Sequence, residues 1–317
     1  MMGKVDMKTL LLGANGQLGR TFLDQGALAA CGELVAASRN GVLAAGGNGE
    51  VADLSTPESL PALLDRVRPD VIVNAAAYTA VDRAEQEEAL ATRVNGEAVG
   101  VLGRWAAAHG TLMIHYSTDY VFDGRRSQPY AVDEATGPLG AYGRSKLAGE
   151  QALSDSGADH LMFRTAWVYA AHGHNFLRTM LRLGAERDEL RVVADQHGAP
   201  TDTMLIVEAS LAALDRWLQA DAAQRRALAG THHLVASGAT TWHGFASAIV
   251  EQATALGLLA HAPRVVAIGS AEFPTATVRP AWSLLDNAEF QRHFAFPLPD
   301  WRQGLRKTMQ ELITSTN

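Results

Sequence analysis

A tyrosine and a lysine four residues apart could carry out acid–base chemistry. They stand in the segment Tyr142-Gly-Arg-Ser-Lys146. Residues four apart on a helix share a face, and a nearby ammonium group lowers the pKa of a tyrosine, which is ordinarily about 10. A tyrosine tuned in this way can protonate an oxygen while hydride reaches the carbon beside it. Alone, the spacing fits an ordinary helix with a packed tyrosine and an exposed lysine better.

A glycine-rich turn near the start of the chain could bind a dinucleotide. Residues 8–12 form an apolar run that predicts a buried parallel strand, and residues 17–29 predict a helix. Between them, Gly13, Gly16 and Gly19 allow a tight turn and a close approach of backbone to pyrophosphate. The amino end of the helix attracts the phosphates. A generic strand–turn–helix is the alternative, and the position at the chain start favours the dinucleotide.

The end of the second predicted strand bears on cofactor choice. Residues 33–37 lead into Ser38 and Arg39. A free 2′-hydroxyl usually meets an acid at this point, whereas a 2′-phosphate requires a cation and small donors. The pair favours NADPH, with a surface arginine in a loop as the alternative. After the next strand, Asp53 could bond the adenine amine or cap a helix starting near Pro57, as the two hydroxyls following it could.

Strands alternate with helices through the first half of the chain. A long helical stretch is expected over 82–109, and further strands at 69–75, 110–117 and 159–165. The alternation predicts an α/β fold with a Rossmann-like doubly wound parallel sheet, whose ligands bind outside the carboxyl ends of the strands. We expect a dinucleotide-binding domain over 1–165. A smaller, helix-rich carboxyl-terminal substrate lobe should occupy mainly 166–317, interleaved with the first domain.

Composition narrows the class of protein. A length of 317 residues predicts about two domains. The net charge of −7, without a basic run, argues against nucleic-acid binding. Apolar runs fall far short of a membrane span, and no basic, apolar leader opens the chain. Cys31 is the single cysteine, so an internal disulfide and a cysteine-based metal site are excluded. These features predict a cytoplasmic protein with a small-molecule substrate.

A third candidate group follows the predicted strand 110–117. The hydroxyls of Ser117 and Thr118 could each hydrogen-bond a substrate carbonyl oxygen and polarise it. Turn or cap chemistry is the alternative for such a pair.

Taken together, these motifs resemble the extended short-chain dehydrogenase/reductase superfamily and, within it, the dTDP-4-dehydrorhamnose reductases. The early motifs mark the superfamily only. The segment Asp195-Gln-His-Gly-Ala-Pro-Thr201 is far more specific to this reductase group. The other matching segments are residues 13–19, 73–85, 115–124, 142–150, 163–169, 175–176 and 279–283.

The resemblance implies reduction of the C4 ketone of dTDP-4-dehydro-6-deoxy-L-mannose to dTDP-L-rhamnose. NADPH is the implied cofactor, although many members also accept NADH. By the family pattern, Tyr142 would donate the proton, Lys146 would hold the ribose and tune Tyr142, and Thr118 would bond the sugar oxygen. Asp119 and Trp167 would contact the substrate. From the residues alone, Trp167 reads as a packing residue.

The resemblance also implies a set of cofactor contacts, some of which the residues predict independently. Those along the pyrophosphate, the adenosine and the rest of the cofactor are Gly13, Gly16, Gln17, Leu18, Gly19, Ser38, Arg39, Asp53, Leu54, Ala77, Tyr78, Thr79, Tyr116, Tyr142 and Lys146.

One departure from the family concerns a metal. Some members hold Mg²⁺ between subunits with an acid on the first helix, but residues 19–22 contain none here. We therefore assign no metal ligand, although the family resemblance keeps Mg²⁺ possible, and we leave monomer and homodimer open. His172, His174, His232 and His233 have no third ligand at a suitable spacing, so metal binding is not expected there either.

Several other charged or aromatic residues have structural interpretations. The acids among residues 82–88 are expected to complement a helix dipole. Arg279 could reach a diphosphate or form a structural salt bridge, with equal support for each. Trp242, Trp282 and Trp301 are expected to pack in the core or the lobe.

Two rival functions stay open at this stage. The chain could reduce or epimerise another nucleotide-4-ketosugar, since an epimerase on this fold keeps its cofactor without net oxidation. It could also be a non-catalytic regulatory subunit on the same fold. The intact set of Thr118, Tyr142 and Lys146 argues against the second rival.

Overall fold

Seven parallel strands form the central sheet of the computed structural model, which describes residues 7–314. Their spatial order is β11-β6-β5-β4-β1-β2-β3, so the order reverses between β1 and β4. The strands are β1 Met7–Leu12, β2 Gly32–Ser38, β3 Glu50–Val51, β4 Val71–Asn74, β5 Leu112–Thr118, β6 His160–Thr165 and β11 Gly230–His233. This confirms the predicted doubly wound α/β fold.

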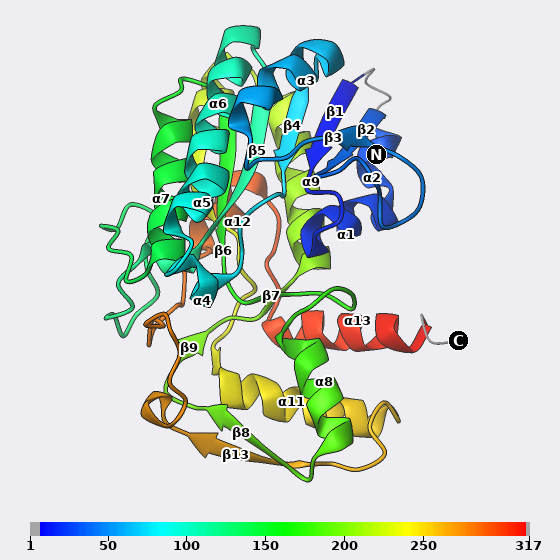
Figure 1. The fold of residues 1–317 in the computed structure, drawn as a ribbon, viewed down its shortest axis with the longest axis vertical. Coiled ribbons are helices and arrows are strands. Elements are labelled where there is room, and N and C mark those ends of the chain that lie inside the picture. The colour runs from blue at the N-terminus through cyan, green and yellow to red at the C-terminus, as the bar shows by residue number, and fades with distance from the viewer. Residues whose placement is uncertain (1–6, 315–317) are drawn as a thin grey trace.

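Helices cover both faces of this sheet (Figure 1). One face carries α3 Leu60–Val67, α6 Ala98–His109 and α7 Ala141–Ser154. The other carries α1 Gln17–Gln25, α2 Ala27–Ala30, α9 Thr203–Gln219 and α12 Ala288–Phe294. Below α1 in Figure 1, α13 Trp301–Thr314 lies on the side of the smaller lobe. Within residues 7–314, we find no helix with the length and apolarity needed to cross a bilayer.

The residues of β1 show why this strand reads as a continuous apolar run. Leu10 and Leu12 pack into the cluster with α3 and α6, whereas Leu11 packs into the cluster with α1 and α9. Successive side chains of a strand point to opposite faces, and both faces are buried in a parallel sheet covered by helices. Alternation is therefore absent from the sequence of β1.

Two predicted helices are interrupted. The helix expected over 17–29 breaks at Gly26, whose φ of 63° ends α1 before α2 begins. The helical stretch expected over 82–109 is divided into α4 Val81–Ala84, α5 Glu88–Thr92, a π-helical turn Arg93–Glu97, and α6. The periodic pattern predicted helical content correctly but not these breaks.

The later half of the chain builds a smaller lobe and also returns to the main sheet. In the lower part of Figure 1, α8 Phe176–Glu186 and α11 Trp242–Ala255 lie beside β8 Glu189–Val193 and β13 Arg264–Ile268, which pair in parallel. The remaining elements are β7 Val168–Tyr169, β9 His197–Gly198, β10 Thr201–Asp202, β12 Thr240–Thr241 and α10 Ala222–Leu228. β11 then joins β6 at the edge of the main sheet. The boundary between residues 165 and 166 stays a prediction.

Candidate active site

The helix that carries Tyr142 and Lys146 is fixed at its amino end by Glu85. The Glu85 carboxylate accepts a hydrogen bond from the backbone N–H of Ala141 at 2.9 Å. Gly143 follows Tyr142, and a Cβ at Gly143 would lie 2.2 Å from the carbonyl oxygen of Tyr120. The missing side chain lets α7 approach the segment that follows β5. The predicted catalytic pair is thus held by a cap and by a close backbone contact.

The acids among residues 82–88 bind distant segments, a role beyond the dipole effect expected from the sequence. Besides Glu85, three of these acids accept hydrogen bonds from residues outside the segment 82–88. Asp82 accepts from Arg279 at 3.1 Å, Glu87 from the Tyr78 hydroxyl at 2.6 Å, and Glu88 from Arg144 at 2.7 Å. Of the two interpretations of Arg279, the structure shows the salt bridge.

Lys146 is buried beneath the site. Its ammonium group donates to the carbonyl oxygen of Tyr116 at 2.6 Å and lies 3.5 Å from Nε2 of His115. Burial lowers the pKa of Lys146 to about 8. Burial, and then the charge of Lys146, holds the pKa of His115 well below its usual value, so this ring is neutral. His115 also contacts the Asn74 amide at 3.1 Å, and sequence reasoning missed both residues.

Tyr142 has a pKa shifted in the direction opposite to the sequence-based expectation. Burial raises the pKa of Tyr142 to about 12, and hydrogen bonding with the Thr118 side chain offsets only part of this effect. The loss of hydration outweighs any stabilisation of the phenolate by Lys146. Tyr142 is therefore protonated at neutral pH and can act as a proton donor.

Of the two candidate hydroxyls after β5, only that of Thr118 lies with Tyr142. The Ser117 hydroxyl donates to Glu150 at 2.5 Å, and Glu150 also forms a buried ion pair with Arg164 at 2.7 Å. Ser117 is thereby committed to a structural network. The Thr118 hydroxyl donates to Asp119 at 2.9 Å and lies close enough to Tyr142 to lower the pKa of the phenol.

Asp119 is a buried carboxyl group beside this cluster. It is 3% exposed, and burial raises its pKa to about 6, with Ser283 and Thr118 offsetting part of the shift. Such a group changes charge close to neutral pH. A hydroxyl-rich ligand could satisfy it by donating hydrogen bonds.

Trp167 adopts a left-handed backbone conformation with φ of 50°. Its ring lies flat on that of Trp242, with centroids 3.6 Å apart and an angle of 7° between the planes. A Cβ at Gly198 would lie 2.4 Å from the Trp167 ring, which explains the glycine in the 195–201 segment. Trp167 is half-buried, and Trp242, interpreted from the sequence as a packing residue, supports it from α11.

The predicted phosphate turn lies at the point where the strand order reverses. Gly13 has φ of 79°, and a Cβ there would lie 2.6 Å from the backbone nitrogen of Ala76 after β4. A Cβ at Gly19 would lie 2.2 Å from the Gly13 carbonyl oxygen. Gly16 precedes α1 as its N-cap, followed by Gln17 and Leu18. This arrangement leaves backbone N–H groups and a helix amino end available to an anion.

Beyond β2, Arg39 is exposed and free, whereas Ser38 is occupied. The Ser38 hydroxyl donates to the Val42 carbonyl at 2.9 Å. Arg39 forms no ion pair or side-chain hydrogen bond within residues 7–314. Asn15 holds the loop in place, donating to Val42 O at 2.8 Å and accepting from Ala44 N at 2.7 Å. Sequence reasoning missed this contact between the phosphate turn and the loop.

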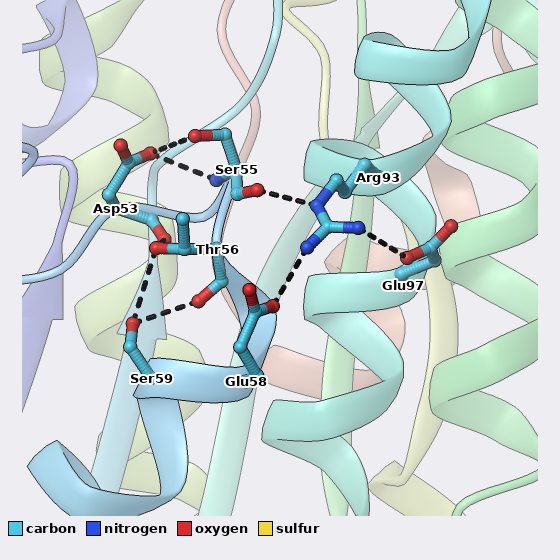
Figure 2. Close-up of polar contacts among 7 residues, drawn as sticks. All are labelled: Asp53, Ser55, Thr56, Glu58, Ser59, Arg93 and Glu97. Atoms are coloured by element: carbon cyan, nitrogen blue, oxygen red, sulfur yellow. Dashed lines mark hydrogen bonds and ion pairs between the residues drawn. The ribbon is translucent and has the colours of Figure 1, made fainter.

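Asp53 folds back on its own turn, as Figure 2 shows. One of its oxygens accepts from the Ser55 backbone N–H at 2.9 Å and from the Ser55 hydroxyl at 2.7 Å. It does not cap the short helix after Thr56, so that alternative is wrong. Arg93 braces the same turn by donating to Ser55 O at 2.6 Å. Leu54, the next predicted adenine contact, is buried at 4% exposure.

The loop after β4, with Ala77, Tyr78 and Thr79, is held by Asn95. The Asn95 side chain accepts from Tyr78 N at 2.8 Å and donates to Tyr78 O at 3.0 Å. The other predicted contact in this region, Tyr116, directs its hydroxyl to Ser210 in α9 at 2.8 Å. A cofactor contact by Tyr116 would therefore come from its backbone.

The lobe contacts the phosphate turn through Gln17. Asn175 caps α8 and donates to the Gln17 side chain at 2.8 Å, while His172 lies 3.0 Å from the Gln17 carbonyl oxygen. His172 is thus a structural histidine, as expected. On the same helix, Thr21 occupies the region where some family members have an acid, and its hydroxyl contacts Gln17 O and Thr203. Residues 19–22 do not fit a magnesium ligand set.

Comparison with known proteins identifies the family. The family model for the RmlD substrate binding domain matches residues 7–314. The dTDP-4-dehydrorhamnose reductase of Burkholderia thailandensis is 45% identical over 97% of this chain and 100% of that protein. The chain belongs to this family. The Escherichia coli K12 reductase is 42% identical over 98% of this chain and 99% of that protein.

Solved structures agree with this assignment. A dTDP-4-dehydrorhamnose reductase from Clostridium acetobutylicum has a TM-score of 0.84 at 30% identity, covering 97% of this chain and 100% of that one. A Bacillus anthracis reductase in complex with NADP has a TM-score of 0.81 at 28% identity, with the same coverage. The resemblance inferred from the motifs is confirmed, and with it the class of enzyme.

Proposed function

We propose that this protein reduces the C4 ketone of dTDP-4-dehydro-6-deoxy-L-mannose to give dTDP-L-rhamnose, with NADPH as reductant. The observation that carries the proposal is the grouping of Thr118 beside Tyr142, close enough to lower the pKa of the phenol, with Lys146 buried on the same helix as Tyr142. This group follows the carboxyl end of β5, where a doubly wound sheet binds its ligands. Membership of the reductase family supports the same reaction.

The residues around the glycine turn fit a phosphorylated dinucleotide. The close approach at Gly13 and the exposed amino end of α1 suit a pyrophosphate. Arg39 is exposed and unpaired after β2, so it can bind a 2′-phosphate. A bound NADPH supplies the hydride for the reduction. The remaining cofactor contacts inferred from the sequence are part of this proposal.

The chain's own groups then act on the substrate oxygen. When the substrate binds, the Thr118 hydroxyl redirects its single O–H from Asp119 to the ketone oxygen and polarises the carbonyl. Tyr142 is protonated at neutral pH and donates its proton to the oxygen as negative charge develops there. Lys146 uses one donor on Tyr116 O and lies 3.5 Å from His115 Nε2, which leaves at least one of its three donors for a ribose hydroxyl.

The sugar is held between the sheet and the lobe. Asp119 accepts hydrogen bonds from sugar hydroxyls, and the loss of water from this buried carboxyl makes such donors favourable. Trp167, supported by Trp242, offers a flat apolar surface to one face of the ring.

The reaction is tested with purified protein, NADPH and dTDP-4-dehydro-L-rhamnose generated in situ. NADPH oxidation is followed by absorbance, and the sugar product is identified by NMR. We expect stoichiometric oxidation and dTDP-L-rhamnose as the product. Tight NADPH binding without oxidation would instead favour another nucleotide-4-ketosugar, and binding of neither sugar nor NADPH would favour a regulatory subunit.

A further inference from the structure

Three potential metal ligands converge at the edge of the sheet, on elements that carry none of the proposed catalytic groups. His232 comes from β11, and Glu289 and His293 come from successive turns of α12. The Glu289 carboxylate oxygen lies 3.8 Å from Nδ1 of His232 and 3.7 Å from Nδ1 of His293. All three ligand atoms lie within 4.8 Å of one another. These distances are longer than hydrogen bonds, so the atoms converge without binding each other.

The hydrogen bond at the far side of the His232 ring sets its tautomer. Nε2 lies 2.9 Å from the carbonyl oxygen of Leu228 and must donate its proton there. Nδ1 of His232 is then unprotonated and carries a lone pair. This atom is buried without a hydrogen-bond partner among the described residues. Nδ1 of His293 is also buried without one. Buried polar atoms that lack a partner call for an unseen ligand.

We propose that His232, Glu289 and His293 bind a divalent cation of the Zn²⁺ type. Two imidazole nitrogens and one carboxylate oxygen form a recognised zinc ligand set. A tetrahedral ion with ligand bonds of about 2.0–2.1 Å needs ligand atoms about 3.3 Å apart, so the three atoms must draw together from their spacing of up to 4.8 Å when the ion binds. Glu289 is 36% exposed, so a water can reach the cluster from its carboxylate side as the fourth ligand.

The surroundings of His232 orient its ring toward the other two ligands. The Leu228 carbonyl orients His232 as an outer-shell acceptor does in known metal sites. The ring of Phe294 lies 4.9 Å from His232 and limits solvent access from the core side.

A metal here would join the edge strand β11 to α12 and stabilise the folded chain, without a part in the reduction. It also corrects the expectation that these histidines have no third ligand. That ligand and the second histidine lie in a helix far downstream in the sequence. Linear spacing therefore gave no signal.

The test is a calorimetric titration of the metal-stripped full-length protein with Zn²⁺ alone, together with thermal unfolding with and without Zn²⁺. We expect one equivalent per chain and a higher melting temperature with Zn²⁺. His293→Ala and Glu289→Gln should each weaken binding at least about tenfold, the usual scale for a lost contact to a metal. Both positions are partly exposed, and unchanged NADPH binding will show that each variant is folded.

His261→Ala is the matched control. His261 is an exposed histidine 3.6 Å from a carboxylate of Asp188, and it lacks the third ligand. Its loss should leave Zn²⁺ binding and the melting temperature unchanged. Absence of saturable Zn²⁺ binding would show that water, and not a metal ion, fills the space among His232, Glu289 and His293. Equal Zn²⁺ binding by the wild type and both site variants would place the ion elsewhere. Either result overturns the proposal.

Discussion

The side-chain amide of Asn95 donates a hydrogen bond to the hydroxyl of Ser145 at 2.9 Å, inside the Tyr142–Lys146 motif. The same side chain pairs with both backbone groups of Tyr78. One buried amide thus links the loop after β4 to the helix proposed to carry the catalytic residues.

Replacing Asn95 should therefore disturb stability and cofactor binding together. Asn95→Ala leaves the Tyr78 N–H unpaired, and we expect the free energy of unfolding to fall by about 1–3 kcal/mol in urea denaturation. NADPH affinity should also fall. Ser145→Ala removes one hydrogen bond of the set and should cost about 0.5–1.5 kcal/mol. Equal stability of the Asn95 variant and the wild type would contradict the role of Asn95 as a link.

Tyr142→Phe tests the proposed proton donor. The change removes the hydroxyl and keeps the ring that packs edge-on against Tyr120. We expect kcat to fall about a hundredfold or more, the usual worth of a general acid, with NADPH affinity almost unchanged. Steady-state kinetics and fluorescence titration measure the two effects. Turnover at the wild-type rate would remove Tyr142 from the mechanism.

Arg39→Ala tests the site for the 2′-phosphate. Since Arg39 is exposed and has no ion pair among the described residues, its removal should leave the fold intact. We expect NADPH affinity to fall by about tenfold or more, the scale of a charge-assisted hydrogen bond, with NADH affinity nearly constant. Arg306→Ala, at an exposed position of α13, is the charge-matched control. Similar losses for the two cofactors would argue against a phosphate contact.

The buried Lys146 predicts an alkaline limit to cofactor binding. Its pKa is lowered to about 8, so the ammonium form prevails below that pH and is lost above it. If this charge holds the ribose, NADPH affinity of the free protein should be constant below pH 8 and fall up to about tenfold per pH unit above it. Lys146→Met should bind weakly with no such decline. A decline of the same size in this variant would assign it to another group.

The sequence predicted the features that depend on local pattern. The apolar run of β1, the glycine turn and the Tyr142–Lys146 spacing each lie within a few residues, so periodicity and steric demands are readable. The fold class and the enzyme family are confirmed on that basis. The roles assigned to individual site residues stay predictions.

Features set by long-range packing were not readable. Asn95 contacts Ser145, and Trp242 contacts Trp167, only after the chain has folded. Nothing in the sequence around these residues indicates their partners. The pKa of Tyr142 was predicted in the wrong direction because its main cause is burial, which the spacing of a tyrosine and a lysine does not report.

The π-helical turn Arg93–Glu97 sets the rotation of α6 about its axis, relative to the segment before the turn. A wide turn of this kind contains one residue more than an α-helical turn. Without that residue, α6 would rotate by about 100° relative to the segment before it. Two arrangements could then no longer occur together. One is the contact of Asn95 with the loop that contains Tyr78, and the other is the burial of the apolar side of α6. The additional residue of the π-helical turn allows both arrangements at once. Deleting a single residue from this turn should therefore destabilise the fold more than any substitution of that residue.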